Sequence, residues 1–69
     1  MFDKLEFIIC LKRANLTVED VANALDINVT TLYRKINGDS DFYRHEIEVI
    51  CNLIGRENLE KVFFSQKLA

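Results

Sequence analysis

The sequence predicts an all-α fold in which five short helices surround one core. Its 69 residues contain no proline and only two glycines, so few positions interrupt a helix. Apolar residues recur at helical spacing, and the sustained period-two alternation that indicates strands is absent. Hydrophobic residues make up 49% of the chain, which suits the single domain, 1–69, that this length allows. A core of this size contributes a net stability of roughly 3–5 kcal/mol.

The first expected helix covers about residues 3–14. One of its faces has the i, i+3, i+4, i+7 spacing of a helix that packs on a core, at Phe7, Cys10, Leu11 and Ala14. Phe2, Leu5 and Ile9 fall partly outside this face. They either cover neighbouring helices or form a self-association surface, and the second interpretation predicts a homodimer.

A second helix is expected to begin after Thr17. The Thr17 hydroxyl can cap this helix, and Asp20, three residues later, can return the bond as in a capping box. Val21 and Leu25 are one turn apart and form its apolar face, and the small Ala22 allows another helix to cross closely.

A tight turn follows, in which Ile27 is expected to enter the core and Asn28 caps a third helix over about 29–36. Leu32 and Ile36 point inward, and a left-handed Gly38 ends the helix after Asn37. Segment 17–38 is therefore two short helices joined by a turn. Such a helix-turn-helix unit typically places its second helix in the major groove of DNA.

Two more helices complete the predicted domain, and residues 65–69 are expected to fray. The fourth helix runs from about 43 to 54 and ends at Gly55, with inward residues Ile47, Ile50, Cys51 and Ile54. The last runs over about 57–64, with inward residues Leu59, Val62 and Phe63.

Nearly the whole chain resembles one family in its spacing and residue types. The matching positions are Leu16, Thr17, Ala22, Leu25, Ile27, Leu32, Arg34, Asn37, Gly38, Phe42, Glu46, Ile47, Val62, Phe63 and Phe64. They are similar to the lambda-repressor-like (Cro/repressor-type, XRE) helix-turn-helix proteins, particularly small phage-type regulators of Gram-positive bacteria. The resemblance implies a DNA-binding transcriptional regulator, a phage-type repressor that occupies its double-stranded operator as a dimer.

Three positions depart from the family's pattern. Asp26 stands in the turn where the family most often has glycine, and aspartate tolerates a left-handed backbone better than most residues. Val18 and Val29 stand where many members carry polar residues, at Val18 a glutamine that touches DNA. These valines favour an alternative: a protein-interaction module or accessory phage protein that keeps the fold without reading DNA. A small DNA-packaging or excision accessory is an intermediate possibility.

The candidate DNA-binding residues lie on and near the third helix. Arg34 can bond a guanine edge with its two-pronged guanidinium, or it contacts only phosphate or solvent. The others suit backbone positioning, methyl contacts or capping; Arg44 is added because the family often contacts phosphate there. The full set is Asn28, Thr30, Thr31, Tyr33, Arg34, Lys35, Asn37 and Arg44.

Charge gives this interface little support. The net charge is −2 and the pI is about 5.2, whereas DNA-binding domains usually carry a basic patch. Segment 28–45 is locally basic, with Arg34, Lys35 and Arg44 against Asp39 and Asp41. Few phosphate contacts imply that the affinity for DNA depends only weakly on salt concentration. A dimer would double the number of phosphate contacts.

The sequence favours a cytoplasmic binding protein over an enzyme. One histidine, no phosphate-binding glycine loop and no catalytic grouping leave no candidate catalytic residues, cofactor or small-molecule substrate. Cys10 and Cys51 are expected to be buried free thiols; a disulfide, or a zinc site completed by His45, is the alternative. The apolar run 5–11 is too short for a signal peptide or a membrane span.

Overall fold

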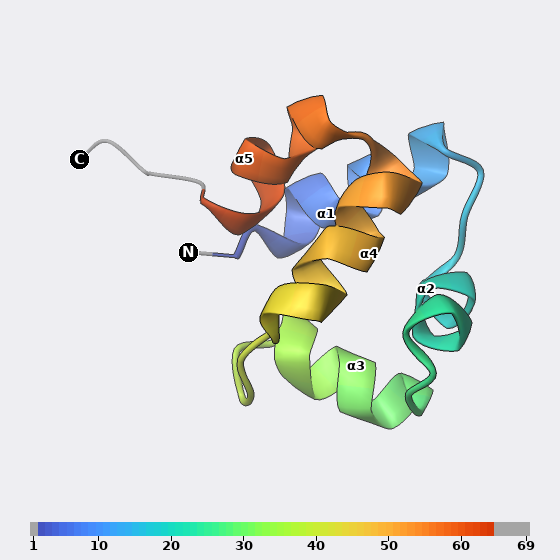
Figure 1. Cartoon of the computed structure of the whole chain (residues 1–69), viewed down its shortest axis with the longest axis vertical. Helices are drawn as coiled ribbons and strands as arrows, with labels where there is room; N and C mark the ends of the chain where they lie inside the picture. Colours follow the sequence, from blue (N-terminus) through green and yellow to red (C-terminus); the bar gives the residue numbers. More distant parts are fainter. Residues whose placement is uncertain (1, 65–69) are drawn as a thin grey trace.

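The computed structural model describes residues 2–64 and confirms the all-α, five-helix fold. Figure 1 shows the chain order. The elements are α1 (Lys4–Arg13), α2 (Val18–Leu25), α3 (Val29–Ile36), α4 (Arg44–Ile54), one 3-10 turn (Arg56–Asn58) and α5 (Leu59–Phe63). The helix expected over 57–64 is thus a 3-10 turn that continues into α5. The fraying expected of residues 65–69 lies outside the described part of the chain.

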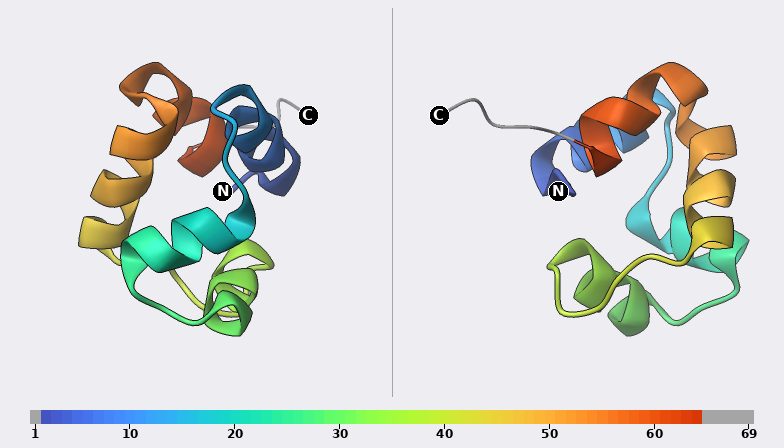
Figure 2. Two further views of the ribbon diagram at one scale, coloured as in Figure 1. Left: turned by 90° about the vertical axis from the view of Figure 1, so that its right-hand side faces the viewer. Right: turned by 60° about the vertical axis from the view of Figure 1, so that its left-hand side comes forward.

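The helices form two groups that α4 connects. α1 and α5 lie side by side at one end of the molecule, and α2 and α3 form the other end (Figure 2). α4 runs from the first group to the second and contacts α2 along the way. The outer side of α3 therefore faces away from α1 and α5, at an extremity of the molecule.

The core lies between these two groups and contains most of the residues predicted to point inward. Ile27, Ile47 and Leu59, also predicted inward, are half-buried at its edge, and Ala14 is exposed. The buried apolar residues are Phe7, Cys10, Leu11, Val21, Ala22, Leu25, Leu32, Ile36, Ile50, Cys51, Ile54, Val62 and Phe63.

Ala14 is the one predicted inward residue that is exposed, because α1 ends one residue earlier than expected. Ala14 caps α1 and is exposed, and Asn15 then adopts a left-handed backbone with φ of 59°. The Leu16 N–H donates to Leu11 O at 2.8 Å and the Asn15 N–H to Lys12 O at 3.1 Å. These two bonds form a Schellman motif, which ends α1 with Ala14 as its exposed C-cap.

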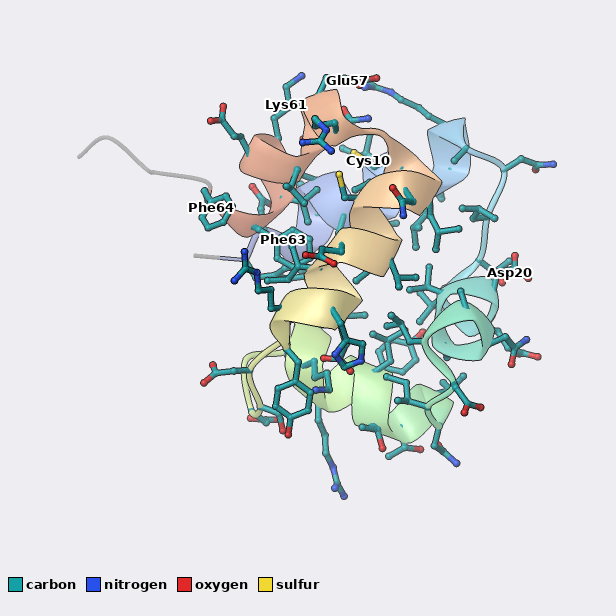
Figure 3. All side chains as sticks on the ribbon, in the orientation of Figure 1. Cys10, Asp20, Glu57, Lys61, Phe63 and Phe64 are labelled. Atoms are coloured by element: carbon teal, nitrogen blue, oxygen red, sulfur yellow. The ribbon has the colours of Figure 1, made fainter. Side chains whose placement is uncertain are left out.

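The start of the described chain is anchored to its end. The Asp3 N–H donates to Val62 O at 2.6 Å, and the Phe2 ring lies 5.0–5.3 Å from the rings of Phe7, Phe42 and Phe63. Figure 3 shows Phe63 inside the molecule, whereas Phe64 points outward from the end of α5. Phe2 is thus half-buried against rings of its own domain, which favours the first of its two interpretations, that it covers neighbouring helices.

Candidate nucleic-acid interface

The helix-turn-helix unit begins with the predicted capping box. The Asp20 N–H donates to Thr17 Oγ1 at 3.1 Å, and the Thr17 N–H donates to Asp20 Oδ2 at 2.8 Å. Two of the unpaired N–H groups at the start of α2 are thereby satisfied, and acidic Glu19 and Asp20 complement the helix dipole. This arrangement fixes where α2 begins relative to the turn.

The turn between the helices is held by Asp26 and Asn28. Asp26 has a left-handed backbone with φ of 57°, the conformation for which the family uses glycine. The Ile27 N–H donates to Ala22 O at 3.0 Å, and Asn28 Oδ1 accepts from the Thr30 N–H at 2.8 Å. The cap predicted at Asn28 is therefore confirmed, and it sets the first turn of α3.

Leu32 and Ile36 hold α3 against the core, as predicted, and leave its opposite side exposed. Four of the predicted residues lie on the exposed side: Thr30, Tyr33, Arg34 and Asn37. Within the described residues, the Arg34 guanidinium forms no ion pair or hydrogen bond. A planar five-donor group that no partner occupies is chemically suited to a base edge or a phosphate.

Lys35 is a correction, because its side chain is only 6% exposed. Its ammonium lies 2.9 Å from Glu46 Oε1, donates to Asp41 O at 3.0 Å and lies 4.1 Å from the centroid of the Tyr43 ring. These contacts turn Lys35 toward α4 and away from the exposed side of α3. The Lys35 ammonium is therefore paired inside the protein and is not available to a phosphate.

The remaining three predicted residues are placed differently from one another. Thr31 is half-buried on the side of α3 that faces the start of α4, beside Tyr43 and Glu46. Asn28 is exposed, although its amide oxygen is used for capping. Arg44 is 95% exposed at the start of α4, with Glu48 Oε1 3.8 Å from its Nε. Only Arg44 of these three presents a charge outward.

The C-terminal end of α3 is closed by the loop that follows it. Gly38 has φ of 89°, as its left-handed assignment requires. The N–H groups of Asp39 and Ser40 donate to Arg34 O at 2.8 and 3.3 Å, and the Gly38 N–H donates to Lys35 O at 3.2 Å. Two carbonyls of the last turn of α3 therefore have partners, which reduces the negative potential expected at a helix C-terminus.

Lys4, the first residue of α1, lies beside the exposed C-terminal end of α3, and no pattern in the sequence predicts this. The Lys4 ammonium donates to Asn37 Oδ1 at 3.0 Å, across 33 positions of sequence. No local pattern connects these residues, since only the folding of α1 against the rest of the core brings them together. On the exposed surface around α3, the structure thus has Lys4 as an unpredicted cation and lacks the predicted cation Lys35.

The structure gives Val18 and Val29 a role in packing. Both are half-buried and lie against the core cluster. Their apolar side chains pack between the helix-turn-helix unit and the core. The apolar residues at these two positions therefore have a structural role.

The exposed charges around α3 are nearly balanced. In segment 28–45, once Lys35 is paired with Glu46, the exposed charged groups are Arg34 and Arg44 against Asp39 and Asp41. Lys4 adds one positive charge at the end of α3. A face with so few cations offers few phosphate contacts for each copy of the chain.

The two thiols are free and buried, as predicted. Burial raises the pKa of the Cys10 thiol, and the nearby Glu6 carboxylate raises it further, so Cys10 stays protonated. Among residues 2–64, no group of three or more His, Cys, Asp or Glu side chains is arranged to hold a metal ion. No helix in this range is long and apolar enough to cross a bilayer.

The arrangement that remains is a helix-turn-helix unit with an outward, polar α3 and a small number of unpaired cations. Comparison with models of protein families, with curated proteins and with solved structures gave no match for this chain.

Proposed function

We propose that the chain is a sequence-specific, double-stranded DNA-binding transcriptional regulator, a repressor of the phage type. The observation that supports this best is the exposed side of α3, where Thr30, Arg34 and Asn37 project from a helix at the extremity of the molecule. A helix about 10–12 Å across fits the major groove, which is about 12 Å wide. α3 enters that groove, and α2 crosses the backbone.

Arg34 is the proposed reader of sequence. It is exposed, unpaired among the described residues and flanked one turn away by Thr30 and Asn37. Its guanidinium can bond O6 and N7 of one guanine together, and a threonine methyl can contact thymine. Tyr33, also exposed, is suited to the sugar–phosphate backbone.

Dimerisation is part of the proposal because one copy offers few cations. Leu5 is 72% exposed on α1, and Ile9, one turn later, is half-buried without belonging to the core cluster. These two side chains are the proposed self-association surface, now without Phe2. Two copies double the phosphate contacts and read two half-sites of a palindromic operator.

The balanced charge around α3 favours a second candidate, a protein-interaction module or accessory protein that keeps this fold without reading DNA. Asp39 and Asp41 are exposed in the loop after α3, and Arg44 has Glu48 as a neighbour. Carboxylates so close to the proposed groove-binding helix repel phosphate. A packaging or excision accessory would share the docking geometry of the regulator without repressing transcription.

Selection from random duplexes separates these candidates. The purified chain is incubated with a randomised duplex library at low and at physiological salt, and bound duplexes are sequenced over several rounds. A regulator enriches one palindromic site at both salt concentrations. An interaction module enriches no sequence, and binding that is lost at physiological salt without enrichment indicates non-specific charge attraction only.

A further inference from the structure

The contact between Lys4 and Asn37 places an ammonium group beside the C-terminal end of α3. Lys4 is the first residue of α1, Asn37 caps α3, and the Lys4 ammonium donates to Asn37 Oδ1 at 3.0 Å. Figure 2 shows the start of α1 close to the end of α3. We infer that Lys4 and Asn37 together form a contact site for a backbone phosphate of the DNA duplex; this inference rests on the proposed function.

The donors of this pair suit an anion. An ammonium has three N–H donors, of which one is used on Asn37, and it has no acceptor. Because Lys4 bonds the oxygen side of the Asn37 amide, the NH₂ group of that amide stays available to donate two hydrogen bonds. The pair therefore offers hydrogen-bond donors from two helices, and both side chains are exposed to solvent.

The surroundings leave the charge of Lys4 available. Within residues 2–64, Lys4 forms no ion pair, so no carboxylate oxygen lies within bonding distance of its ammonium. The carbonyls of Arg34 and Lys35 at the end of α3 are already bonded to the following loop, which limits their repulsion of an approaching phosphate. An exposed lysine–asparagine bond also contributes little to folding, so the contact has little structural purpose alone.

The position of the pair matches the proposed reading geometry. Asn37 follows Arg34 by three residues, so the two side chains lie about one turn apart on the exposed side of α3. A phosphate bound by Lys4 and Asn37 would therefore lie at the C-terminal end of the helix that carries the proposed reader. Such a contact fixes the depth and direction of α3 without carrying sequence information.

The test measures how affinity for the selected duplex depends on salt. The variants are Lys4→Gln, which removes the charge, and Lys4→Arg, which keeps it. Lys12→Gln is the matched control, because Lys12 is an exposed lysine of the same helix for which the structure shows no contact with α3. Both positions are exposed, and thermal melting of each of the three variants verifies that the domain remains folded.

Lys4→Gln should weaken binding several-fold for the selected duplex and for mismatched duplexes alike. It should also lower the slope of log K against log salt concentration by about 0.9 per copy of the chain. Lys4→Arg should retain the wild-type slope. Lys12→Gln changes the net charge equally and should leave the slope within error of the wild type.

A Lys4→Gln slope equal to that of the wild type would overturn the inference, as would equal losses in Lys4→Gln and Lys12→Gln. In both cases the wild type still binds its duplex, so the proposed function stands. If the wild type itself selects no duplex, the proposed function and the phosphate site fail together.

Discussion

Lys35 Nζ lies 2.9 Å from Glu46 Oε1, and this buried ion pair joins the last turn of α3 to the first turn of α4. Glu46 also accepts the Tyr43 N–H at 2.8 Å, and Lys35 donates to Asp41 O. One lysine and one glutamate thus tie the loop between the two helices at both ends. The pair determines how α3 is held, and it predicts where the domain is most sensitive to substitution.

Glu46→Gln should lower the free energy of unfolding by about 3 kcal/mol, because it leaves the buried Lys35 ammonium without its counter-charge. Urea denaturation at low temperature, followed by circular dichroism, measures the loss. Glu48→Gln is the control: its exposed neighbour Arg44 is 3.8 Å away, and its loss should cost less than about 0.5 kcal/mol. Similar losses in both variants would mean that the buried ion pair contributes no more to the free energy of unfolding than the exposed one.

The same carboxylate predicts a pH dependence. Burial acts to raise the pKa of Glu46, but the Tyr43 N–H and the Lys35 ammonium outweigh it, so the pKa lies below the ordinary 4.5. Its contribution to stability is therefore complete above pH 4.5 and is lost as pH falls through the lower folded-state pKa. The difference in unfolding free energy between wild type and Glu46→Gln should shrink below pH 4.5. A constant difference down to pH 3 would contradict this assignment.

Asp26→Gly should raise the free energy of unfolding by up to about 1 kcal/mol, because the left-handed backbone at this position suits glycine better. Ala24→Gly is the control, since residue 24 is exposed inside α2 and replacing alanine by glycine there should cost about 1 kcal/mol. Thermal melting of both variants gives the comparison. A lower melting temperature for Asp26→Gly would show that the aspartate contributes something besides its tolerance of the turn.

Arg34→Ala should weaken binding to the selected duplex by about 1–3 kcal/mol and relax the preference at one base pair. The melting temperature should hardly change, because Arg34 is exposed. Arg13→Ala is the control, since Arg13 is an exposed arginine at the far end of α1. Fluorescence anisotropy with the selected and point-mutated duplexes measures both effects. Unchanged affinity would remove Arg34 from the reading role.

Leu5→Glu and Ile9→Glu should each raise the dimer dissociation constant at least tenfold, because each places a carboxylate in the proposed apolar contact. Ala24→Glu adds the same charge at an exposed position of α2 and should leave association unchanged. Analytical ultracentrifugation over a range of concentrations makes the measurement. A wild type that remains monomeric at the highest concentration would end the dimer proposal.

The sequence was most informative where bonds are local. Thr17 and Asp20 are three residues apart and Asn28 and Thr30 two, so both caps could be predicted from spacing. The apolar period along α3 likewise predicted that Leu32 and Ile36 are buried. Each of these features depends on the geometry of a single helix or turn.

The sequence was least informative where contacts join distant elements. Lys35 was assigned to the exposed side of α3 because nothing within the helix shows that Glu46 faces it from α4. The contact of Lys4 with Asn37 has no signature in the sequence for the same reason. The two interpretations of Phe2 could not be separated from the sequence, because the rings that cover it come from residues 7, 42 and 63. The prediction that Ala14 is buried was wrong for another reason. α1 ends in a Schellman motif, which depends on a positive φ at Asn15.

The bond between Asp3 and Val62, with the Phe2 ring against Phe63, has a consequence for synthesis on the ribosome. α2 and α3 can form early because their bonds are local, but the aromatic cluster is completed only after residue 63 has left the exit tunnel. A nascent chain arrested at residue 60 should therefore remain open to protease, whereas the released chain should resist it.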